Sequence, residues 1–297
     1  MWQPILMIDG YLLSILGLSM LVPAAYELYL LHAAHSQFVF ASVICIFLGV
    51  MLFLANRMPI KKISLRQGYL ITVVCWLSMT VLAAVPFVLT GTFDNLSDAW
   101  FEAMSGLTAA GGTVLTDIEG APRAVLLWRS MLNGLGGIGI IIFAVALLPY
   151  LGIGGMQIFQ RENSDSDDKF MPKFSYIAKR IIAVYLFLLV ACVVCYQQAG
   201  MSWFDAINHG LTTTSTGGLS TKNNSFAFFD SWRVELVAVV FMILGSLPMT
   251  FYIALLQNKD FHSSRSIQVV ASFKILGVYI LLLSLWLMWH NGMGLLT

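Results

Sequence analysis

Long uninterrupted apolar runs are the feature that most restricts how this chain can fold. Each run is about as long as the ~20 residues that a helix needs to cross a bilayer, in a chain that is 59% hydrophobic and only 10% charged. A backbone in lipid must satisfy its own hydrogen bonds, which favours helices. We therefore predict an all-α membrane protein with about seven transmembrane segments. They fall near residues 5–30, 38–56, 68–90, 124–150, 180–198, 233–256 and 273–289.

The Lys and Arg residues predict which side of the membrane each connection faces. Basic or mixed connections alternate with two Gly/Ser/Thr-rich stretches at 91–123 and 199–232. Placing the basic connections inside puts twelve of the 16 Lys and Arg residues there and leaves four outside. The four are Arg123, Arg129, Lys222 and Arg233. By the positive-inside rule, we expect a multi-pass protein with a cytoplasmic N-terminus and two polar stretches that face outward.

The chain contains an internal repeat. The stretch "AWFEAMSGLTAAGGTVLT" at 99–116 resembles "SWFDAINHGLTTTSTGGLST" at 202–221, with Trp100 aligned with Trp203. In each copy a Trp-Arg pair then opens an apolar run that ends in Leu-Pro. Both copies have the same orientation, because two spans separate them. Parallel copies around a pseudo-axis along the membrane normal enclose a centre, to which each copy contributes once.

The short amphipathic segment of each copy is a candidate re-entrant pore helix. Residues 98–107 and 203–211 are too short to cross a bilayer at ~1.5 Å per residue, so each can only dip in and return. Side chains and glycines of the kinds that begin and end helices flank both segments. These are Ser97–Asp98 and Gly106 for the first segment, and Ser202, Asp205 and Gly210 for the second.

The polar runs that follow these segments can offer oxygen atoms to a cation. A helix that dips in from outside points its partly negative C-terminal end into the membrane. Irregular backbone is tolerated at that depth only where protein buries it or where it lines a water-filled path. Its carbonyl oxygens can then replace the water shell of a cation. The alternative is that both runs are ordinary extracellular turns, in which Ser, Thr and Gly are common, but the duplication favours a pore.

These residues resemble the Trk/Ktr/HKT superfamily of potassium uptake proteins, and in particular its TrkH family. The similarity rests on "WFEAMSGLTAAGGTVLT", "LLWRSMLNGLGGIGIIIFAVALLP" and "NHGLTTTSTGGLST" with the two leading spans, and it covers the chain in order. The resemblance implies four span–pore helix–span repeats around one axis, each with a filter strand that carries a central glycine. It also implies potassium uptake across the bacterial inner membrane, homodimerisation, and a cytoplasmic nucleotide-binding ring protein of the TrkA type as partner.

By position, the resemblance implies two potassium-binding filter strands and no cofactor besides the transported ion. The strands are Ala109, Ala110, Gly111 and Gly112, and Ser215, Thr216, Gly217 and Gly218. Gly111 corresponds to the first filter glycine, whereas the second is either Gly217 or Gly218. The first strand has Ala-Ala-Gly where the family commonly has Thr-Thr-Gly, which keeps the backbone carbonyls but removes a hydroxyl.

Two of the four implied repeats are complete in this sequence. We therefore expect either a truncated or split member whose missing half is another chain, or association of two copies. The expected function is the pore-forming subunit of a potassium uptake system, and the alternative is a non-conducting fragment or assembly subunit. The expected regions are two N-terminal transmembrane helices (1–67), the first repeat (68–156), a cytoplasmic loop (157–179), the second repeat (180–256), and a cytoplasmic linker with the first span of an incomplete third repeat (257–297).

Two short motifs are interpreted as packing features. The G-x-G-x-x-G pattern at 134–139 lies inside an apolar span with no strand before it, so we expect its glycines to serve close helix packing or a bend rather than nucleotide binding. Cys192 and Cys195 form a C-x-x-C pattern at lipid depth without a His or carboxylate beside it. We expect both cysteines to be packing residues.

Charged residues beside the two short segments allow two interpretations each. Arg129 and Arg233 either anchor their spans at the interface or hold a pore helix through Glu102 or Asp205. The two acids either concentrate cations at the outer mouth or cap helices. The sequence contains no Ser/His/Asp or paired-carboxylate arrangement, and its net charge is +1. We therefore expect neither an enzyme nor a nucleic-acid-binding protein.

Overall fold

The computed structural model of the chain describes residues 2–31, 34–58, 65–151, 170–248, 251–252, 255 and 267–291. Within these ranges all regular structure is helical, which confirms the predicted all-α fold. Five helices of the described part are long and apolar enough to cross a membrane. The chain divides into two compact units, Met1–Ser246 and Leu247–Thr297, and both predicted filter strands lie in the first.

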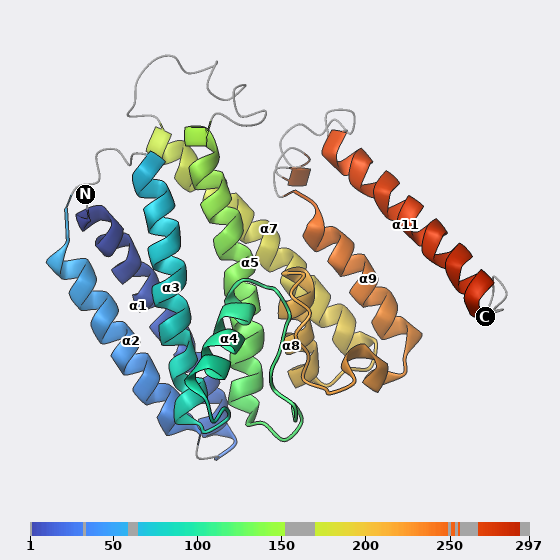
Figure 1. The fold of residues 1–297 in the computed structure, drawn as a ribbon, viewed down its shortest axis with the longest axis horizontal. Helices are drawn as coiled ribbons and strands as arrows, with labels where there is room; N and C mark the ends of the chain where they lie inside the picture. The colour runs from blue at the N-terminus through green and yellow to red at the C-terminus, as the bar shows by residue number, and fades with distance from the viewer. Residues whose placement is uncertain are drawn as a thin grey trace. The chain divides into compact units, whose positions relative to one another are not determined.

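A helical hairpin of α1 (Gln3–Tyr29) and α2 (His35–Ala55) begins the first unit (Figure 1). Glycine lets the two helices approach closely, since a Cβ on Gly10 would lie 2.5 Å from the α2 backbone. Ser42 Oγ donates a hydrogen bond to the Gly17 carbonyl across the pair at 2.7 Å. Small residues and interhelical hydrogen bonds of this kind join helices in lipid, where the hydrophobic effect does not.

The first predicted repeat consists of two long helices with a short one between them. The elements are α3 (Leu65–Leu89), α4 (Leu96–Leu107) and α5 (Arg123–Leu151). Trp128 of α5 is fully buried, and its Nε1 donates to the Ala83 carbonyl of α3 at 3.0 Å. The Trp128 ring also meets Phe38 of α2 edge to face. The hairpin and this repeat therefore share one core.

The second predicted repeat has the same order of elements. They are α7 (Phe170–Gln198), α8 (Trp203–Thr214), the 3-10 helix η2 (Ser225–Phe229) and α9 (Trp232–Ser246). Tyr196 of α7 is buried, and its hydroxyl lies 2.7 Å from Thr213 Oγ1 of α8. Cys192 is buried in the same core and Cys195 is half-buried beside it. Both cysteines pack as predicted.

Two long helices have one end about ten residues from its predicted position. α7 begins at Phe170, within the range expected to be a loop, because Pro172 falls in its first turn, where proline is tolerated. The rest of that expected loop lies outside the described residues. α9 ends at Ser246 instead of near residue 256, because Pro248 disfavours a helical conformation at Leu247. In the second unit, α11 (Ile267–Asn291) is a single long apolar helix.

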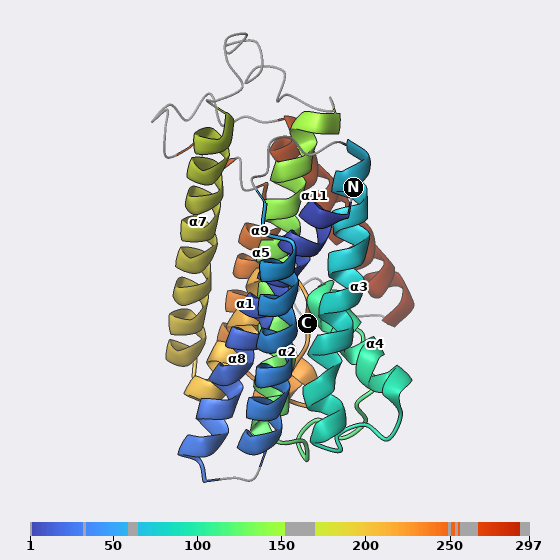
Figure 2. The ribbon, with the colours of Figure 1, turned by 90° about the vertical axis from the view of Figure 1, so that its left-hand side faces the viewer.

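The short helices α4 and α8 lie toward the same end of the first unit. Figures 1 and 2 show both near the end at which α3 ends and α5 begins, and the extended segments that follow them return to that end. Each short helix is therefore entered and left from one side.

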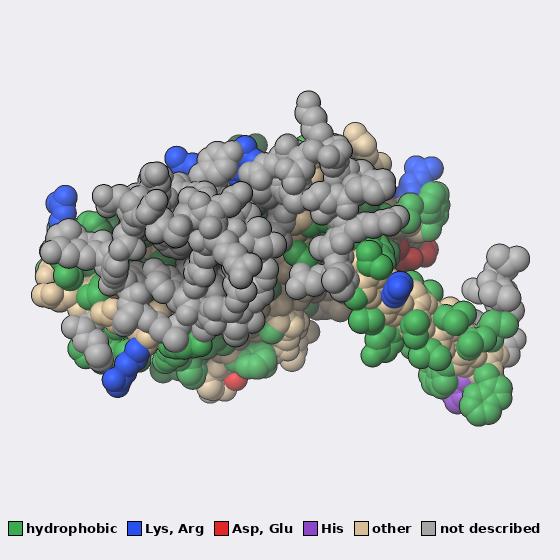
Figure 3. Space-filling view, turned by 90° about the horizontal axis from the view of Figure 1, so that it is seen from above, with side chains coloured by type: hydrophobic (Ala, Val, Ile, Leu, Met, Phe, Trp, Pro, Cys, Tyr) green, Lys and Arg blue, Asp and Glu red, His purple; other side chains and the backbone are tan. Residues whose placement is uncertain are grey.

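The opposite end of the first unit is the one at which α3 begins and α5 ends. Figure 3 looks onto this end and shows Lys and Arg side chains around its margin, with hydrophobic side chains on the flanks. Arg57, just after α2, and Arg66, in the first turn of α3, belong to the helix ends on this side. Arg57 and Arg66 thus lie at the end opposite to the short helices.

Candidate cation filter

The two short helices begin differently. Ser202 is the N-cap of α8, and its Oγ accepts a hydrogen bond from the Asp205 N–H at 3.1 Å and donates to the Asp205 carboxylate at 2.7 Å. The predicted helix-start signal at Ser202 and Asp205 is confirmed. α4 instead has Asn95 at its N-cap without a side-chain cap, so Ser97 and Asp98 lie in its first turn and not before it. Asp98 there is placed to interact favourably with the positive end of the helix.

The C-terminus of α4 is a Schellman motif that leads directly into the first strand. Thr108 is the C-cap, and Ala109 after it is left-handed with φ of 53°. The Ala109 N–H donates to the Gly106 carbonyl and the Ala110 N–H to the Ser105 carbonyl, both at 3.0 Å. These two bonds define the motif. The strand is therefore anchored to the helix end by its own backbone.

The C-terminus of α8 repeats this geometry 107 residues further along the chain. Thr216 is left-handed with φ of 56°, and its N–H donates to the Thr213 carbonyl at 3.0 Å. The Gly217 N–H donates to the Thr212 carbonyl at 2.8 Å. Each donor and acceptor corresponds to one at α4. The two short helices thus deliver their strands in the same way.

The second left-handed residue of each strand relates the glycines of the two copies. It is Gly111 in the first strand, with φ of 74°, and Gly218 in the second, with φ of 83°. Gly217 then corresponds to Ala110. In backbone conformation, Gly218 is therefore the counterpart of Gly111, a choice that the sequence leaves open.

Hydrogen bonding leaves mainly oxygen atoms free on the two strands. All four N–H groups of residues 215–218 donate to carbonyls at the end of α8. Within the described part of the chain, no hydrogen bond reaches the carbonyl oxygens of residues 109–111 or 215–218. Unpaired carbonyl oxygens at the negative ends of two helices form the kind of site that a dehydrated cation occupies.

The structure brings the two predicted strands into contact. A Cβ built on Gly111 would overlap the carbonyl oxygen of Gly217 and lie 3.2 Å from its carbonyl carbon. Gly111 also has a positive φ, which glycine adopts without steric cost. Glycine is therefore required at this position for both space and backbone conformation.

Glycines of α5 let that helix approach both short helices. A Cβ on Gly136 would overlap the carbonyl oxygen of Leu107, the last residue of α4, and one on Gly134 would lie 2.7 Å from Leu211 Cδ2 of α8. The prediction that these motif glycines serve close packing is confirmed. Gly139 is different, because a Cβ there would meet no atom within 4 Å.

Helix α8 ends later than predicted and is packed by glycines of its own repeat. Gly210 does not end the helix, which continues to Thr214. It lies instead against α7, where a Cβ would be 2.5 Å from Val193 Cγ2. A Cβ on Gly245 of α9 would lie 2.6 Å from the Thr214 carbonyl oxygen. In both copies the span after the short helix thus places a glycine against its last carbonyl.

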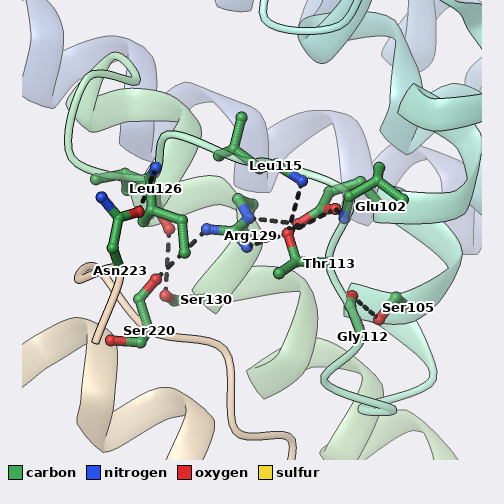
Figure 4. A network of polar contacts seen from close by, with 12 residues as sticks. Glu102, Ser105, Gly112, Thr113, Leu115, Leu126, Arg129, Ser130, Ser220 and Asn223 are labelled. Carbon is green, nitrogen blue, oxygen red and sulfur yellow. Dashed lines mark hydrogen bonds and ion pairs between the residues drawn. The ribbon is translucent and has the colours of Figure 1, made fainter. Parts of the chain in front are cut away.

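A fully buried ion pair lies behind the first strand (Figure 4). Arg129 Nε and Glu102 Oε1 are 2.6 Å apart, with side chains 1% and 0% exposed. Thr113 Oγ1 donates to Glu102 and accepts from Arg129 Nη2, both at 2.9 Å, and the Val114 N–H donates to Glu102 at 3.1 Å. Arg129 Nη1 also donates to the Ser220 carbonyl at 3.4 Å. One guanidinium therefore contacts the residues that follow both strands.

This pair decides between the two interpretations of the charged residues. Glu102 is buried in the middle of α4, so it is neither an acid at the outer mouth nor a helix cap. Arg129 holds the short helix of its repeat. Arg233 is exposed and lies 5.9 Å from the Trp232 ring, which matches an interfacial anchor. Asp205 caps α8.

His209 takes the place of Glu102 in the second copy, a role that the sequence analysis missed. It lies nine residues before Gly218, as Glu102 lies nine before Gly111. His209 Nε2 is 3.0 Å from Ser220 Oγ, and Nδ1 is 2.9 Å from a carbonyl one turn earlier. Nδ1 therefore carries the proton and Nε2 accepts. An alignment of the two copies at Gly111 and Gly218 pairs His209 with Glu102. An alignment at the Trp-Phe pairs instead matches Glu102 with Asp205, which is why the sequence analysis missed His209.

The loops beyond the two strands are joined to each other. Asn223 Oδ1 accepts from the Ile118 N–H at 2.9 Å, and the Asn223 N–H donates to the Glu119 carboxylate at 3.3 Å. Lys222 Nζ lies 4.0 Å from the same carboxylate. These contacts link the two copies through the loops that follow their strands.

Relatives of the chain are potassium uptake proteins by name. The chain is 36% identical to the Trk system potassium uptake protein TrkH of Vibrio parahaemolyticus over 264 residues, which is 88% of this chain and 54% of that protein. It is 35% identical to the Trk system potassium uptake protein TrkG of Escherichia coli over 289 residues, or 96% of this chain and 59% of that protein. The chain spans about half the length of the curated relatives it matches.

Structure and sequence profile agree with these similarities. The fold is similar to the crystal structure of the potassium transporter TrkH from Vibrio parahaemolyticus, with a TM-score of 0.87 and 32% identity over 99% of this chain and 60% of that one. The profile of the TrkH family, described as cation transport protein, matches residues 34–288. The chain belongs to the TrkH family of cation transport proteins.

Proposed function

We propose that the chain is a pore-forming subunit for potassium uptake across the bacterial inner membrane. Potassium passes inward through a filter lined by backbone carbonyls of two strands. The strands are Ala109, Ala110, Gly111 and Gly112, and Ser215, Thr216, Gly217 and Gly218. The observation that carries the proposal is the set of unpaired carbonyl oxygens at the C-terminal ends of α4 and α8. The names of the relatives support potassium as the cation.

Within this filter, we assign equivalent roles to Gly111 and Gly218. Both have a positive φ two residues after the left-handed cap of their helix. Ala109 and Ala110 lack the hydroxyls common at these positions, but a carbonyl filter needs only the backbone. We therefore propose that the first strand also binds potassium, through its backbone carbonyls.

We also propose that the N-terminus is cytoplasmic and that the short helices enter from outside. Arg57 and Arg66 lie at the end of the first unit opposite to α4 and α8, and basic connections stay on the cytoplasmic side. Cations then meet the filter from outside and move down the membrane potential. The division into two N-terminal helices, two repeats and an incomplete third is part of the same proposal.

The remaining partners follow from the length of the relatives. We propose that a second copy of this chain or a separate chain supplies the other filter strands, because this chain spans about half of those proteins. A nucleotide-binding ring protein of the TrkA type binds the cytoplasmic face, as the family resemblance implies.

Growth of an uptake-deficient bacterial strain at low potassium tests the function. We expect this chain to restore growth when it dimerises or when the missing repeats are supplied. Gly111→Ala should abolish rescue, because the new Cβ would overlap the Gly217 carbonyl. Gly91→Ala is the matched control, since Gly91 also has a positive φ, of 66°, but open space around it. Sodium-selective flux, or full rescue by Gly111→Ala, would contradict the filter.

A second candidate function is a non-conducting assembly subunit. It is favoured by the presence of two proposed filter strands in a chain that covers 52% to 60% of its relatives. Potassium flux into liposomes that contain only this purified chain separates the candidates. Flux supports the pore, and absence of flux from a correctly folded homo-oligomer supports the subunit.

A further inference from the structure

Ser105 of α4 holds the first filter strand at two points, one on either side of Gly111. Its carbonyl oxygen accepts a hydrogen bond from the Ala110 N–H at 3.0 Å. Its side-chain Oγ donates to the Gly112 carbonyl at 2.5 Å, a bond that Figure 4 shows from close by. Ser105 is only 5% exposed, so its hydroxyl is shielded from water. One residue of the helix thus closes a hydrogen-bonded ring that contains the Ala110 and Gly111 carbonyls.

Within the described residues, the second copy has no such side-chain bond at the corresponding position. Thr212 corresponds to Ser105, since each lies six residues before its filter glycine. The Thr212 hydroxyl donates to the His209 carbonyl of its own helix at 3.3 Å. Leu219, the counterpart of Gly112, is only 3% exposed. Packing of a side chain can therefore hold the second strand at the point where the first strand has a glycine.

Two consecutive glycines explain why the first strand needs a bond at this point. Gly111 has a positive φ, and Gly112 has no side chain that could pack against the protein. Glycine loses more conformational freedom on ordering than any other residue. A site that must become ordered when its ligand binds has a lower affinity than a site that is already ordered. The Ser105 hydroxyl removes part of this freedom before an ion arrives.

We propose that Ser105 is a positioning residue of the filter, whose hydroxyl preorganises the Ala110 and Gly111 carbonyls for a cation. The inference rests on the proposed function, because it requires that the first strand binds a cation. Ser105 acts through the backbone of the strand and not as an ion ligand. Since the Gly112 carbonyl is engaged by Ser105, the oxygens of residues 109–111 are the ones that bind the ion in this strand.

Ser105→Ala is the decisive variant, since it removes the hydroxyl and keeps the backbone carbonyl of residue 105. The measurement is the melting temperature of the purified full chain in detergent as potassium chloride replaces choline chloride, from which the potassium dissociation constant follows. We expect this constant to rise by about fivefold, the effect of one lost hydrogen bond. A hydroxyl that only stabilises the fold would lower the melting temperature in choline and leave the constant unchanged.

Two further variants separate the hydrogen bond from the space that the side chain fills. Ser130→Ala is the matched control, because Ser130 is 2% exposed and its hydroxyl bonds the Leu126 carbonyl of its own helix. Its potassium dissociation constant should equal that of the wild type, and a rise as large as in Ser105→Ala would overturn the proposal. Ser105→Cys fills the space with a thiol, which is a weak donor, so it should bind potassium as weakly as Ser105→Ala. Wild-type affinity in Ser105→Cys would show that space filling is sufficient, which would also overturn the proposal.

The outcomes distinguish this inference from the function on which it rests. A wild-type chain without any potassium-dependent rise in melting temperature would overturn the proposed filter and the inference with it. A wild-type response to potassium with an unchanged dissociation constant in Ser105→Ala would overturn the inference alone. Failure of both Ser105 variants to fold in choline would assign the hydroxyl to the folding of α4, and that result also overturns the inference.

Discussion

At the scale of single residues, Arg129 is a buried side chain that connects the two copies. It pairs with Glu102 in full burial and reaches both Thr113 and the Ser220 carbonyl. A buried ion pair adds little net stability when intact, but removal of one partner leaves an uncompensated charge. One guanidinium therefore bonds to a residue after each strand.

Arg129→Gln should lower the free energy of unfolding by about 3–5 kcal/mol, because the Glu102 carboxylate then stays buried without its partner. Arg233→Gln is the matched control from the other Trp-Arg pair. Arg233 is exposed, so its loss should change stability by less than about 0.5 kcal/mol. Denaturant titration of both purified variants in detergent checks the difference, and equal losses would contradict the buried pair.

At the scale of elements, the two short helices differ by a shift of one turn. Trp100 precedes Gly111 by 11 residues, whereas Trp203 precedes Gly218 by 15, and four residues make about one helical turn. The acid of the Trp-Phe motif therefore lies in the middle of α4 but in the first turn of α8. This shift explains why, among the described residues, the acid of the motif forms a buried ion pair in the first copy and not in the second.

The same shift marks how far the sequence could predict these elements. Hydropathy and the repeat were sufficient for the existence and order of the long and short helices. Aligning the copies at Trp100 and Trp203 does not align Gly111 with Gly218. The second copy has four more residues, about one helical turn, between its Trp and its glycine. The pairing of Gly218 with Gly111 required backbone dihedral angles, and the role of His209 required the same alignment.

The close packing of α5 against α4 depends on Gly136. Gly136→Ala should destabilise the protein by about 1–3 kcal/mol, because the new methyl group overlaps the Leu107 carbonyl and the helices must separate. Gly139→Ala, one turn along the same helix, meets open space. It should be neutral or stabilising by up to about 1 kcal/mol, since alanine favours a helix over glycine. Melting temperatures of both variants in detergent give the comparison.

At the scale of the whole first unit, the end of α1 connects the N-terminal hairpin to both copies. Glu27 is fully buried, and its Oε1 accepts from the Ala124 N–H at the start of α5 at 2.8 Å. Tyr26 stacks on Phe204 of α8 with ring centroids 5.4 Å apart. Hydropathy predicted the hairpin as two spans, but such contacts between distant segments leave no periodic pattern in a sequence.

Glu27→Ala should therefore loosen the hairpin from the repeats. We expect a loss of about 1 kcal/mol or more, because the first N–H groups of α5 lose a buried acceptor at the positive end of the helix. Asp94→Ala is the control, since Asp94 is an exposed acid just before α4. Hydrogen exchange of the α5 N-terminus measures the effect, and equal protection in both variants would contradict it.

The Schellman ends of α4 and α8 have a further consequence for how such a pore can be encoded. Each strand hydrogen-bonds with its own short helix, through the Ala109–Gly106 and Thr216–Thr213 pairs among others. A repeat therefore folds its lining without borrowing backbone donors from a neighbour. A gene for a longer pore can consequently be divided between repeats, or two genes fused, without leaving an unsatisfied strand at the junction. The proposed filter could therefore be encoded in separate genes, because the hydrogen bonds of each strand lie within its own repeat.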